Sequence, residues 1–327
     1  MRLVMLSTGP FAVPTFRKLY ETGHEVAALV TGAVRIRRGK PVSAVSPLRE
    51  IAGQHGTAIF DPQGINTAEA RARLAEFRPE LLVVCDYGQI LSAETLAVAQ
   101  LGGLNLHGSL LPKYRGAAPV NWAIYHGEQT SGVTVIHMTP KVDAGPCIAQ
   151  AETPIGPDET AVDLEKRLSQ LGAGLMCQAI DAVGGGRIEP LPQEPASASK
   201  APRLKKADGL IDWRRPAAAI RNQVRAFEPW PKTYTFWHRP QGKPVRLILG
   251  PVEVVQQGDL PEVRSAVVPG EVLEAAGGRL VIAAGAGAVM PQSIQPAGKR
   301  LLGVEEFLRG YRVRQGDRLG PEQRDRE

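Results

Sequence analysis

A short segment near the middle of the chain brings a carboxamide and an imidazole together. Asn105 and His107 stand two positions apart at the end of residues 101–107, which have the pattern of a short apolar strand. Strand side chains alternate between faces, so Asn105 and His107 share one face while Leu104 and Leu106 share the other. Two hydrogen-bond donors aimed at one point suit a carbonyl oxygen that becomes an anion. The alternative is a pair of satisfied polar groups at a strand end.

A carboxylate follows the next strand pattern. Asp143 comes shortly after residues 133–137, and its loop can bring it to His107 if that strand neighbours residues 104–107. A carboxylate beside an imidazole favours the charged ring, fixes its orientation and can pass protons through water. Taken alone, Asp143 is better explained as a turn residue, because Asp-Ala-Gly-Pro is good turn chemistry.

The first half of the chain must supply the scaffold for these residues. Short apolar runs alternate there with helical patterns, as in parallel βαβ units. The predicted strands are 3–6, 26–31, 58–60, 81–85, 104–107 and 133–137, and the predicted helices are 13–21, 47–55, 68–77 and 119–126. This pattern indicates an α/β fold with a parallel sheet, whose reactive crevice lies outside the carboxyl ends of the strands.

The second half changes in character. A long helix is expected over residues 159–183, and residues 190–202 carry Pro, Ala and Ser without periodicity, as a linker does. Beyond it we expect five short strands with Gly and Pro between them, which fit a small β-barrel. Their ranges are 233–237, 245–249, 270–273, 279–283 and 288–291.

Composition excludes several classes of protein. No stretch approaches the roughly 18 consecutive apolar residues of a membrane span, so no membrane partner is expected. The three cysteines are odd in number and lack a Cys-x-x-Cys pair, which argues against disulfides and a zinc site and favours a cytoplasmic protein. Residues 1–200 hold 18 Lys and Arg against 19 Asp and Glu, whereas residues 201–327 hold 21 against 14. The excess of +7 in the C-terminal part suggests a polyanionic partner, or simply a solvated surface.

Several motifs together resemble the methionyl-tRNA formyltransferase family, and the resemblance covers nearly the whole chain. The run Asn105-Leu106-His107-Gly108-Ser109-Leu110-Leu111-Pro112 is specific to the folate-dependent formyltransferase superfamily. Further matching pieces are Phe11–Pro14, Tyr87–Leu91, Arg115–Pro119, Ile211–Trp213, Arg225–Pro231 and Gln295–Lys299. The C-terminal pieces point to the tRNA enzyme within that superfamily.

The resemblance implies a Rossmann-like formyltransferase domain followed by an OB-like barrel (OB-fold). It implies a catalytic domain over residues 1–189, a linker over 190–209, a tRNA-binding domain over 210–315 and a tail over 316–327. The donor would be 10-formyltetrahydrofolate, the acceptor the α-amine of initiator methionyl-tRNA, and no metal would be needed. We expect a monomer.

The resemblance also assigns residues to roles. The catalytic trio would be Asn105, His107 and Asp143. The folate would lie against Asp86, Tyr87, Gly88, Gln89, Ile90, Ser109, Leu110, Leu111 and Pro112. Asp86 departs from the family pattern, where a small residue often precedes Tyr-Gly-Gln.

The tRNA contacts are expected in basic segments. The first is the loop that holds Arg35, Arg37, Arg38 and Lys40, because a long loop in a compact domain is uncommon unless it is functional. Lesser candidates are Lys205, Lys206, Lys299 and Arg300. The aromatic residues Trp213, Phe227 and Trp230 are interpreted as packing in the junction between the domains rather than as platforms for bases.

Other functions remain to be weighed. A formyltransferase acting on an amino-sugar nucleotide would keep the trio, as would a deformylating hydrolase, but the basic C-terminal part speaks against the sugar enzyme. A dinucleotide-dependent oxidoreductase needs Gly-x-Gly-x-x-Gly after the first strand, where this chain has Ser7-Thr8-Gly9-Pro10-Phe11-Ala12. A non-catalytic RNA-binding module does not require a catalytic trio, so the presence of Asn105, His107 and Asp143 argues against it.

Overall fold

The computed structural model of the protein describes residues 1–33, 36–37, 40–41, 46–256, 258 and 267–323. Contacts divide the chain into two compact units, which are described separately. Unit 1 comprises Met1–Val120, Gln129–Ile155 and Asp163–Arg203, and unit 2 comprises Asn121–Glu128, Gly156–Val162 and Leu204–Glu327.

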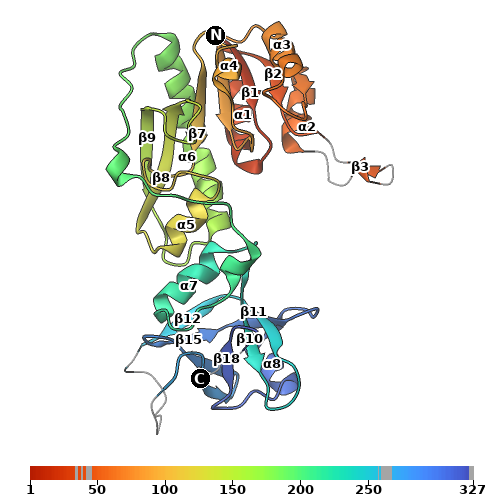
Figure 1. Ribbon diagram of the computed structural model, residues 1–327, viewed down its shortest axis with the longest axis vertical. Helices are drawn as coiled ribbons and strands as arrows, with labels where there is room; N and C mark the ends of the chain where they lie inside the picture. Colours follow the sequence, from red (N-terminus) through yellow and green to blue (C-terminus); the bar gives the residue numbers. More distant parts are fainter. Residues whose placement is uncertain (34–35, 38–39, 42–45, 257, 259–266, 324–327) are drawn as a thin grey trace. The chain divides into compact units, whose positions relative to one another are not determined.

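Unit 1 is built on a sheet of seven strands in the order β5-β2-β1-β6-β7-β8-β9 (Figure 1). Their bounds are β1 (Arg2–Leu6), β2 (Glu25–Val30), β5 (Ala58–Phe60), β6 (Leu81–Cys85), β7 (Gly103–His107), β8 (Thr130–His137) and β9 (Cys147–Pro154). The first five strands in this order are parallel, whereas β8 runs antiparallel to β7, and β9 to β8. The predicted α/β class is confirmed, but the sheet is mixed and not wholly parallel. The link from β8 to β9 is too short for a parallel crossover, which takes a dozen or more residues.

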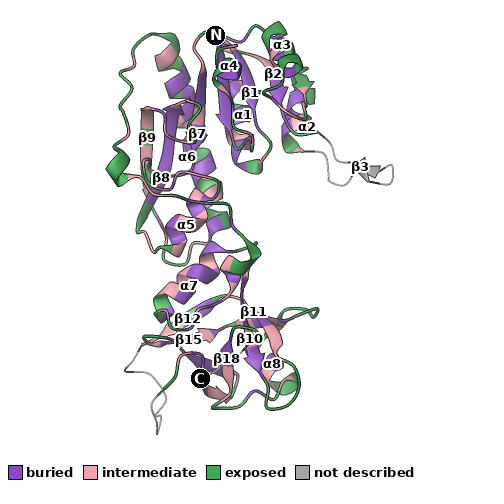
Figure 2. Ribbon diagram, viewed as in Figure 1, coloured by how far each residue is buried: buried purple, intermediate pink, exposed green. Residues whose placement is uncertain are grey.

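Helices pack against this sheet. They are η1 (Pro10–Ala12), α1 (Val13–Leu19), α2 (Pro47–Gln54), α3 (Ala68–Glu76), α4 (Ala93–Leu96) and α6 (Ala161–Gly184), whereas most of α5 (Pro119–Tyr125) belongs to unit 2. The central strands are purple over most of their length in Figure 2, and every residue of β6 is buried. This is why β6 reads as a continuous apolar run, since both of its faces are covered.

The long helix α6 begins two residues later than predicted and ends one residue later. It passes close to β7 at Gly172, where an added Cβ would lie 2.6 Å from the Cδ2 atom of Leu106. The buried residues Leu164 and Leu168 lie on the same helix. The apolar face of β7 is thus packed against α6, which leaves Asn105 and His107 on the opposite face.

Unit 2 holds two antiparallel sheets, ordered β17-β16-β11-β10-β18 and β12-β15-β14-β13. Its elements are η3 (Lys206–Gly209), α7 (Ala217–Ala226), β10 (Thr233–His238), β11 (Val245–Leu249), β12 (Val252–Val255), β13 (Val272–Ala276), β14 (Arg279–Ala283), β15 (Ala288–Pro291), β16 (Ser293–Pro296), β17 (Leu302–Gly303), α8 (Val304–Gly310) and β18 (Arg318–Gly320). All five predicted strands are present, within two to three residues at their ends. The two sheets meet where an isolated bridge pairs Glu271 with Arg318 and where the N–H of Leu319 donates to the carbonyl oxygen of Gly270 at 2.7 Å. Among the described residues these contacts do not form a continuous ladder, so the expected barrel is not closed.

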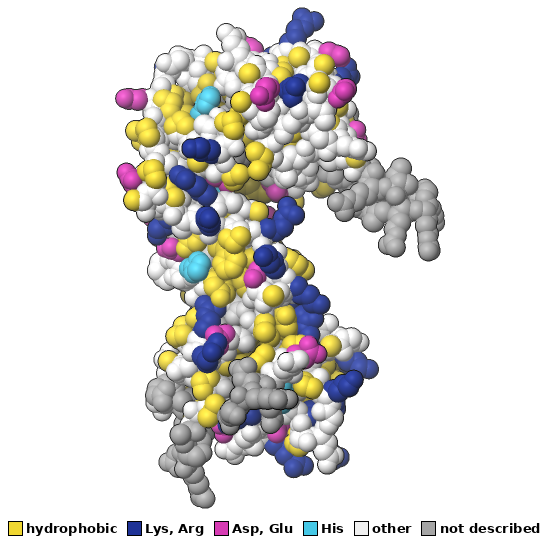
Figure 3. Space-filling model, viewed as in Figure 1, with side chains coloured by type: hydrophobic (Ala, Val, Ile, Leu, Met, Phe, Trp, Pro, Cys, Tyr) yellow, Lys and Arg dark blue, Asp and Glu magenta, His cyan; other side chains and the backbone are white. Residues whose placement is uncertain are grey.

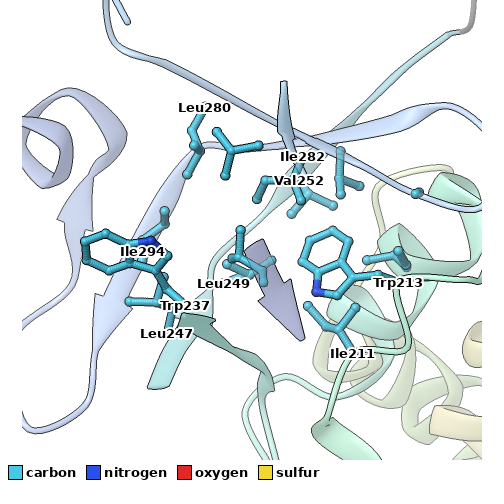
Figure 4. Close-up of a cluster of buried hydrophobic side chains, with 14 of the residues drawn as sticks. Ile211, Trp213, Trp237, Leu247, Leu249, Val252, Leu280, Ile282 and Ile294 are labelled. Atoms are coloured by element: carbon cyan, nitrogen blue, oxygen red, sulfur yellow. The ribbon is translucent and has the colours of Figure 1, made fainter. Parts of the chain in front are cut away.

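The core of unit 2 lies between these elements and is drawn in Figure 4. Trp213 is 4% exposed, and its indole N–H donates to Thr235 Oγ1 at 2.9 Å. Phe227 is fully buried and contacts Trp122 and Tyr125. The burial of Trp213 and Phe227 confirms that both are packing residues, although Trp213 lies in the core of unit 2. The same interpretation is wrong for Trp230, which is 54% exposed.

Among the described residues, none of the helices combines the length and the apolar character required to cross a membrane. The same part of the chain contains no group of three or more His, Cys, Asp or Glu side chains arranged to hold a metal ion. Cys85, Cys147 and Cys177 are free thiols, and burial raises the pKa of Cys85 well above its ordinary value.

Candidate active site

The carboxyl end of β7 carries the two residues singled out by their spacing. Leu104 and Leu106 are buried beneath the sheet on the α6 side, whereas Asn105 and His107 lie on the other face. Asn105 is half-buried and His107 is 5% exposed. The neighbouring strand β6 runs parallel to β7 with Cys85 opposite Leu106, so Asp86 follows at the same edge of the sheet.

Asp143 reaches this edge from the loop between β8 and β9. Strand β8 does neighbour β7, but in the antiparallel sense, with His137 opposite Leu104. Its end therefore lies beside the start of β7, and the loop must turn back over the sheet. Asn105 Nδ2 donates to Asp143 Oδ1 at 3.3 Å, and His107 Nδ1 lies 3.6 Å from Asp143 Oδ2. The structure thus brings the three residues together.

The backbone contributes two further contacts that the sequence pattern did not indicate. The N–H of Gly116 donates to Asp143 Oδ2 at 2.9 Å. The Nε2 atom of His107 lies 2.9 Å from the carbonyl oxygen of Tyr114. A carbonyl oxygen only accepts, so Nε2 carries a hydrogen and Nδ1 is the ring atom turned to Asp143. A carboxylate at this distance orients a charged imidazole and can exchange protons through a water.

The Ser109–Pro112 loop, expected to hold folate, is pinned by a separate hydrogen-bond network. Thr134 Oγ1 donates to the carbonyl oxygen of Ser109 at 2.7 Å and accepts from the N–H of Leu111 at 3.1 Å. Gln150 Nε2 donates to the carbonyl oxygen of Leu111 at 2.7 Å. Leu110 packs on Gly132, where an added Cβ would meet its Cδ2 at 2.5 Å. The loop therefore has a defined backbone shape before any ligand is present.

The second expected folate segment, residues 86–90, begins directly after β6. Asp86 has a positive φ of 50°, and its carbonyl oxygen accepts the N–H groups of Thr8 and Gly9 at 2.9 and 3.2 Å. Its carboxylate covers Gly9, where an added Cβ would lie 1.6 Å from Oδ2. Asp86 is exposed as a whole residue, but partial desolvation of its carboxylate beside Gly9 raises its pKa, offset in part by a hydrogen bond from the backbone of Phe11. Glu165 on α6 also has a raised pKa, through burial first and the charge of Asp86 second.

Residues 87–90 of this segment differ in how far their side chains are exposed. The ring of Tyr87 is 4% exposed and belongs to the core, and burial raises its pKa to about 12. Gln89 Oε1 accepts the N–H of Ile65 at 3.0 Å, while Ile90 is 61% exposed and Gly88 is exposed at φ 78°. Little of the Tyr87 side chain is therefore exposed at this edge of the sheet.

The candidate tRNA contacts are only partly described. Arg35 and Arg38 lie outside the described residues, and Arg37 and Lys40 belong to a short hairpin of β3 (Ile36–Arg37) and β4 (Lys40–Pro41). In unit 2, four exposed cations form two pairs along the chain: Lys205 and Lys206, and Lys299 and Arg300. Arg300 is bound to Glu306, with 3.1 Å between Nη1 and Oε2. On the face drawn in Figure 3, Lys and Arg side chains are spread over unit 2 rather than gathered in one patch.

The sequence missed a third group of residues, which belong to the expected linker. Residues 190–203 are part of unit 1, and Gln193 and Ser199 contact the backbone on either side of the site. Their only signal in the sequence was a polar side chain in a stretch without periodicity. Such a stretch is read as a linker unless its contacts are known.

Comparison with known proteins agrees with this architecture. Residues 1–180 match the formyl transferase family, and residues 203–312 match the formyl transferase C-terminal domain. The methionyl-tRNA formyltransferase of Rhodopirellula baltica is 42% identical, over 98% of this chain and 96% of that protein. The corresponding enzyme of Geobacter sulfurreducens is 37% identical, over 98% and 97%.

A solved structure shares the fold at much lower identity. The N-formyltransferase from Helicobacter canadensis, in complex with folinic acid and dTDP-3-aminofucose, has a TM-score of 0.61 and 16% identity. The match covers 88% of this chain and 98% of that one. At this identity the likeness concerns the fold alone.

Proposed function

The chain belongs to the methionyl-tRNA formyltransferase family, and we propose that it transfers a formyl group from 10-formyltetrahydrofolate to the α-amine of initiator methionyl-tRNA. The observation that carries the proposal is the convergence of Asn105, His107 and Asp143 at the end of β7. These groups can stabilise an oxyanion and accept a proton, which are the two requirements of formyl transfer to an amine.

The first step forms a bond between the amine nitrogen and the formyl carbon. The electron pair of the C=O double bond moves to the formyl oxygen, which becomes negative. Asn105 Nδ2 has two hydrogens, one of which goes to Asp143, so the other can donate to this oxygen. A donor of this kind is typically worth about 3–4 kcal/mol of transition-state stabilisation.

The second step breaks the bond between the formyl carbon and N10 of the folate. The attacking amine must lose a proton, and N10 must gain one. Asp143 takes the amine proton and passes it on through a water, while protonated His107 balances the negative charge of the intermediate. The Nε2 hydrogen of His107 is donated to the carbonyl oxygen of Tyr114. The Nδ1 hydrogen of the protonated ring is therefore the one available for donation in the active site.

The folate fits the edge of the sheet where β6 and β7 end. Residues 86–90 and 109–112 follow these two adjacent strands, and ligands of open α/β sheets bind outside such carboxyl ends. Ile90 and Gly88 are exposed there and can contact a flat ring, while the backbone of Tyr87 and the Ser109–Pro112 loop supply polar groups. The hydroxyl of Tyr87 is buried and has no hydrogen-bond partner among the described residues.

The tRNA would be held by cations that contact its phosphates. We assign this role to Lys205, Lys206, Lys299 and Arg300 in unit 2, and to the basic loop with Arg35, Arg37, Arg38 and Lys40. The net charge of +7 over residues 201–327 suits a polyanion. We further propose a monomer acting in the cytoplasm, where free thiols persist, with a catalytic domain over residues 1–189 and an OB-like C-terminal domain that begins at residue 210. The expected linker and tail are corrected, because residues 190–203 belong to unit 1 and β18 pairs with β10 in the sheet of unit 2.

The test is acceptor specificity. The protein is incubated with 10-formyltetrahydrofolate and either methionyl-tRNA or an amino-sugar nucleotide. Formylation of the methionyl-tRNA alone is expected. Formylation of the sugar would overturn the proposal in favour of the sugar enzyme, and release of formate without transfer would favour a hydrolase.

A further inference from the structure

Four hydrogen bonds meet on the side-chain amide of Gln193. Its Oε1 accepts from Nε and Nη2 of Arg115, at 3.0 and 2.7 Å. Its Nε2 donates to the carbonyl oxygens of Asp143 and Gly145, at 2.9 and 2.7 Å. Both amide hydrogens and both lone pairs of the oxygen are therefore used. The side chain acts as a brace between Arg115 and the loop that carries Asp143.

Gln193 is itself held in place at both ends of its segment, residues 191–201, which we call the strap. Leu191 exchanges two backbone hydrogen bonds with Cys147, at 2.8 and 2.9 Å. At the other end, the N–H of Ala201 donates to the carbonyl oxygen of Arg115 at 2.7 Å. In Figure 1 this stretch follows α6, drawn in green, and passes beside β9. It is an ordered part of unit 1.

The strap also reaches the other side of the site. Ser199 Oγ accepts the N–H of Tyr114 at 2.9 Å, and the carbonyl oxygen of Ser199 accepts the N–H of Arg115 at 2.8 Å. Tyr114 supplies the carbonyl oxygen that binds Nε2 of His107. One segment thus supports the backbone behind His107 and the loop behind Asp143.

The Asp143 loop needs such support because its conformation is costly. Asp143 has a φ of 48°, in a region that residues other than Gly seldom adopt. Gly145 lies so close to the sheet that an added Cβ would be 1.8 Å from the carbonyl oxygen of His137. A strained loop persists only when its surroundings over-determine it. The two hydrogen bonds from Gln193, one on either side of Ala144, are contacts of this kind.

We propose that Gln193 is a positioning residue for the reaction, which holds the Asp143 loop so that its carboxylate stays against Asn105 and His107. The inference rests on the proposed function for its kinetic consequence. The position of the Asp143 carboxylate can be tested without any activity. The N–H of Gly116 donates to Asp143 Oδ2, so protection of this amide from exchange depends on where the carboxylate lies.

Two substitutions distinguish the contacts that Gln193 makes with Arg115 from those it makes with the Asp143 loop. Gln193→Ala removes all four hydrogen bonds. Gln193→Glu keeps an acceptor for Arg115 but loses the donors to the carbonyl oxygens of Asp143 and Gly145. Both variants are expected to lower kcat by about 10–100-fold, because a misplaced catalytic group costs this much, with KM for methionyl-tRNA changed by less than about twofold.

The direct measurement is amide hydrogen exchange in the full chain without substrates. In both variants the Gly116 amide should exchange about tenfold faster, as expected for the loss of one hydrogen bond. The amides of Leu191 and Ala201 should keep their protection, because the strap stays attached. The matched control is Gln223→Ala, since Gln223 Nε2 donates to the carbonyl oxygens of Asp208 and Leu210 in unit 2 at 2.8 and 3.1 Å. It should lower the Tm and leave Gly116 exchange unchanged.

The possible results are distinguishable. Unchanged exchange at Gly116 in Gln193→Ala overturns the proposal, as does a Gln193→Glu variant with full kcat. Loss of protection at Leu191 and Ala201 together with Gly116 also overturns it, because the strap would then have detached as a whole. If the unsubstituted protein formylates no tRNA, the proposed function fails, while the Gly116 measurement still tests the brace.

Discussion

The imidazole of His107 is tied to the backbone of Tyr114, with 2.9 Å between Nε2 and the carbonyl oxygen. This contact decides which ring nitrogen is available to the site, because Nε2 must keep its hydrogen to satisfy the oxygen. Nδ1 is left 3.6 Å from Asp143 Oδ2. The ring is 5% exposed, so no solvent competes strongly for either contact. His107 is therefore oriented from both sides, by a backbone carbonyl and by a carboxylate.

Replacing His107 by Ala should lower kcat for methionyl-tRNA formylation by about two to three decades, because a charge-stabilising donor is lost. The steady-state rate and the Tm are measured together, and the Tm should show that the variant still folds. His55→Ala is the matched control, since His55 is exposed and stacks on Tyr20 away from the site. A His107→Ala variant with near-normal turnover would remove His107 from the mechanism.

Replacing Asn105 by Asp should give a variant whose kcat, relative to that of the wild type, depends on pH. The introduced carboxyl would lie about 3 Å from that of Asp143, and two carboxyls so close cannot both ionise easily. One of them then keeps a proton to higher pH and can donate as Asn105 does. The ratio of variant to wild-type kcat should rise as the pH falls from about 8 to about 6. In Asn105→Ala the same ratio should stay flat, and parallel profiles for both variants would argue against the pairing with Asp143.

The sequence was sufficient to predict that Asn105 and His107 lie on the same face of the sheet, because the side chains of any strand alternate between the two faces. The antiparallel direction of β8 could not be predicted, because its apolar run is compatible with either direction. Strand β9 was missed altogether. It is an edge strand in which Gln150, Glu152 and Pro154 are exposed, so it lacks the apolar content that marks a strand.

The parts of the site supplied by backbone groups were also beyond prediction. The carbonyl oxygen of Tyr114 and the N–H of Gly116 exist in every residue, so no residue type identifies them. Gln193 lies 50 positions from Asp143 along the chain, and its role depends on where the strap runs. Residues without periodicity suggest a linker, although here they form ordered contacts with unit 1.

Replacing Asp86 by Asn should stabilise the protein at neutral pH. Burial raises the pKa of Asp86, so the folded state holds its proton more tightly than the unfolded state. Stability then falls as the pH rises from the ordinary value of 3.8 through the raised one, and the cost is fully present above it. The Tm of Asp86→Asn should exceed that of the wild type near pH 7, and the difference should vanish below about pH 4.

The opposite sign is expected at Asp212, which serves as the control. The hydrogen bond from Arg214 lowers the pKa of Asp212, so its charge stabilises the folded state above the unfolded pKa and this contribution is lost as the pH falls. Asp212→Asn should therefore lower the Tm near neutral pH and converge with the wild type in acid. If Asp86→Asn behaves in the same way as Asp212→Asn, burial is not the dominant influence on Asp86.

Removing a phosphate-binding cation should reduce the salt dependence of tRNA binding. Each neutralised phosphate contributes about 0.7–0.9 to the slope of log K against log salt concentration. Lys205→Ala and Lys206→Ala should each flatten the slope by about this amount, as should Arg37→Ala and Arg38→Ala in the basic loop. Lys18→Ala is the control, because Lys18 lies on α1 near Glu21. An unchanged slope would show that the substituted residue makes no phosphate contact.

Two glycines of α6 should respond in opposite directions to the same change. Nothing lies within 4 Å of a Cβ added at Gly174, so Gly174→Ala should stabilise the helix by about 0.5–1 kcal/mol. A Cβ at Gly172 would meet both Cδ atoms of Leu106, at 2.6 and 2.9 Å. Gly172→Ala should therefore push β7 away from the helix and lower the Tm. Since Leu106 is flanked in the sequence by Asn105 and His107, this shift should also displace these two residues and reduce kcat. Denaturant unfolding and steady-state kinetics of the two variants check this, and equal behaviour would mean that α6 does not support the strand that carries the site.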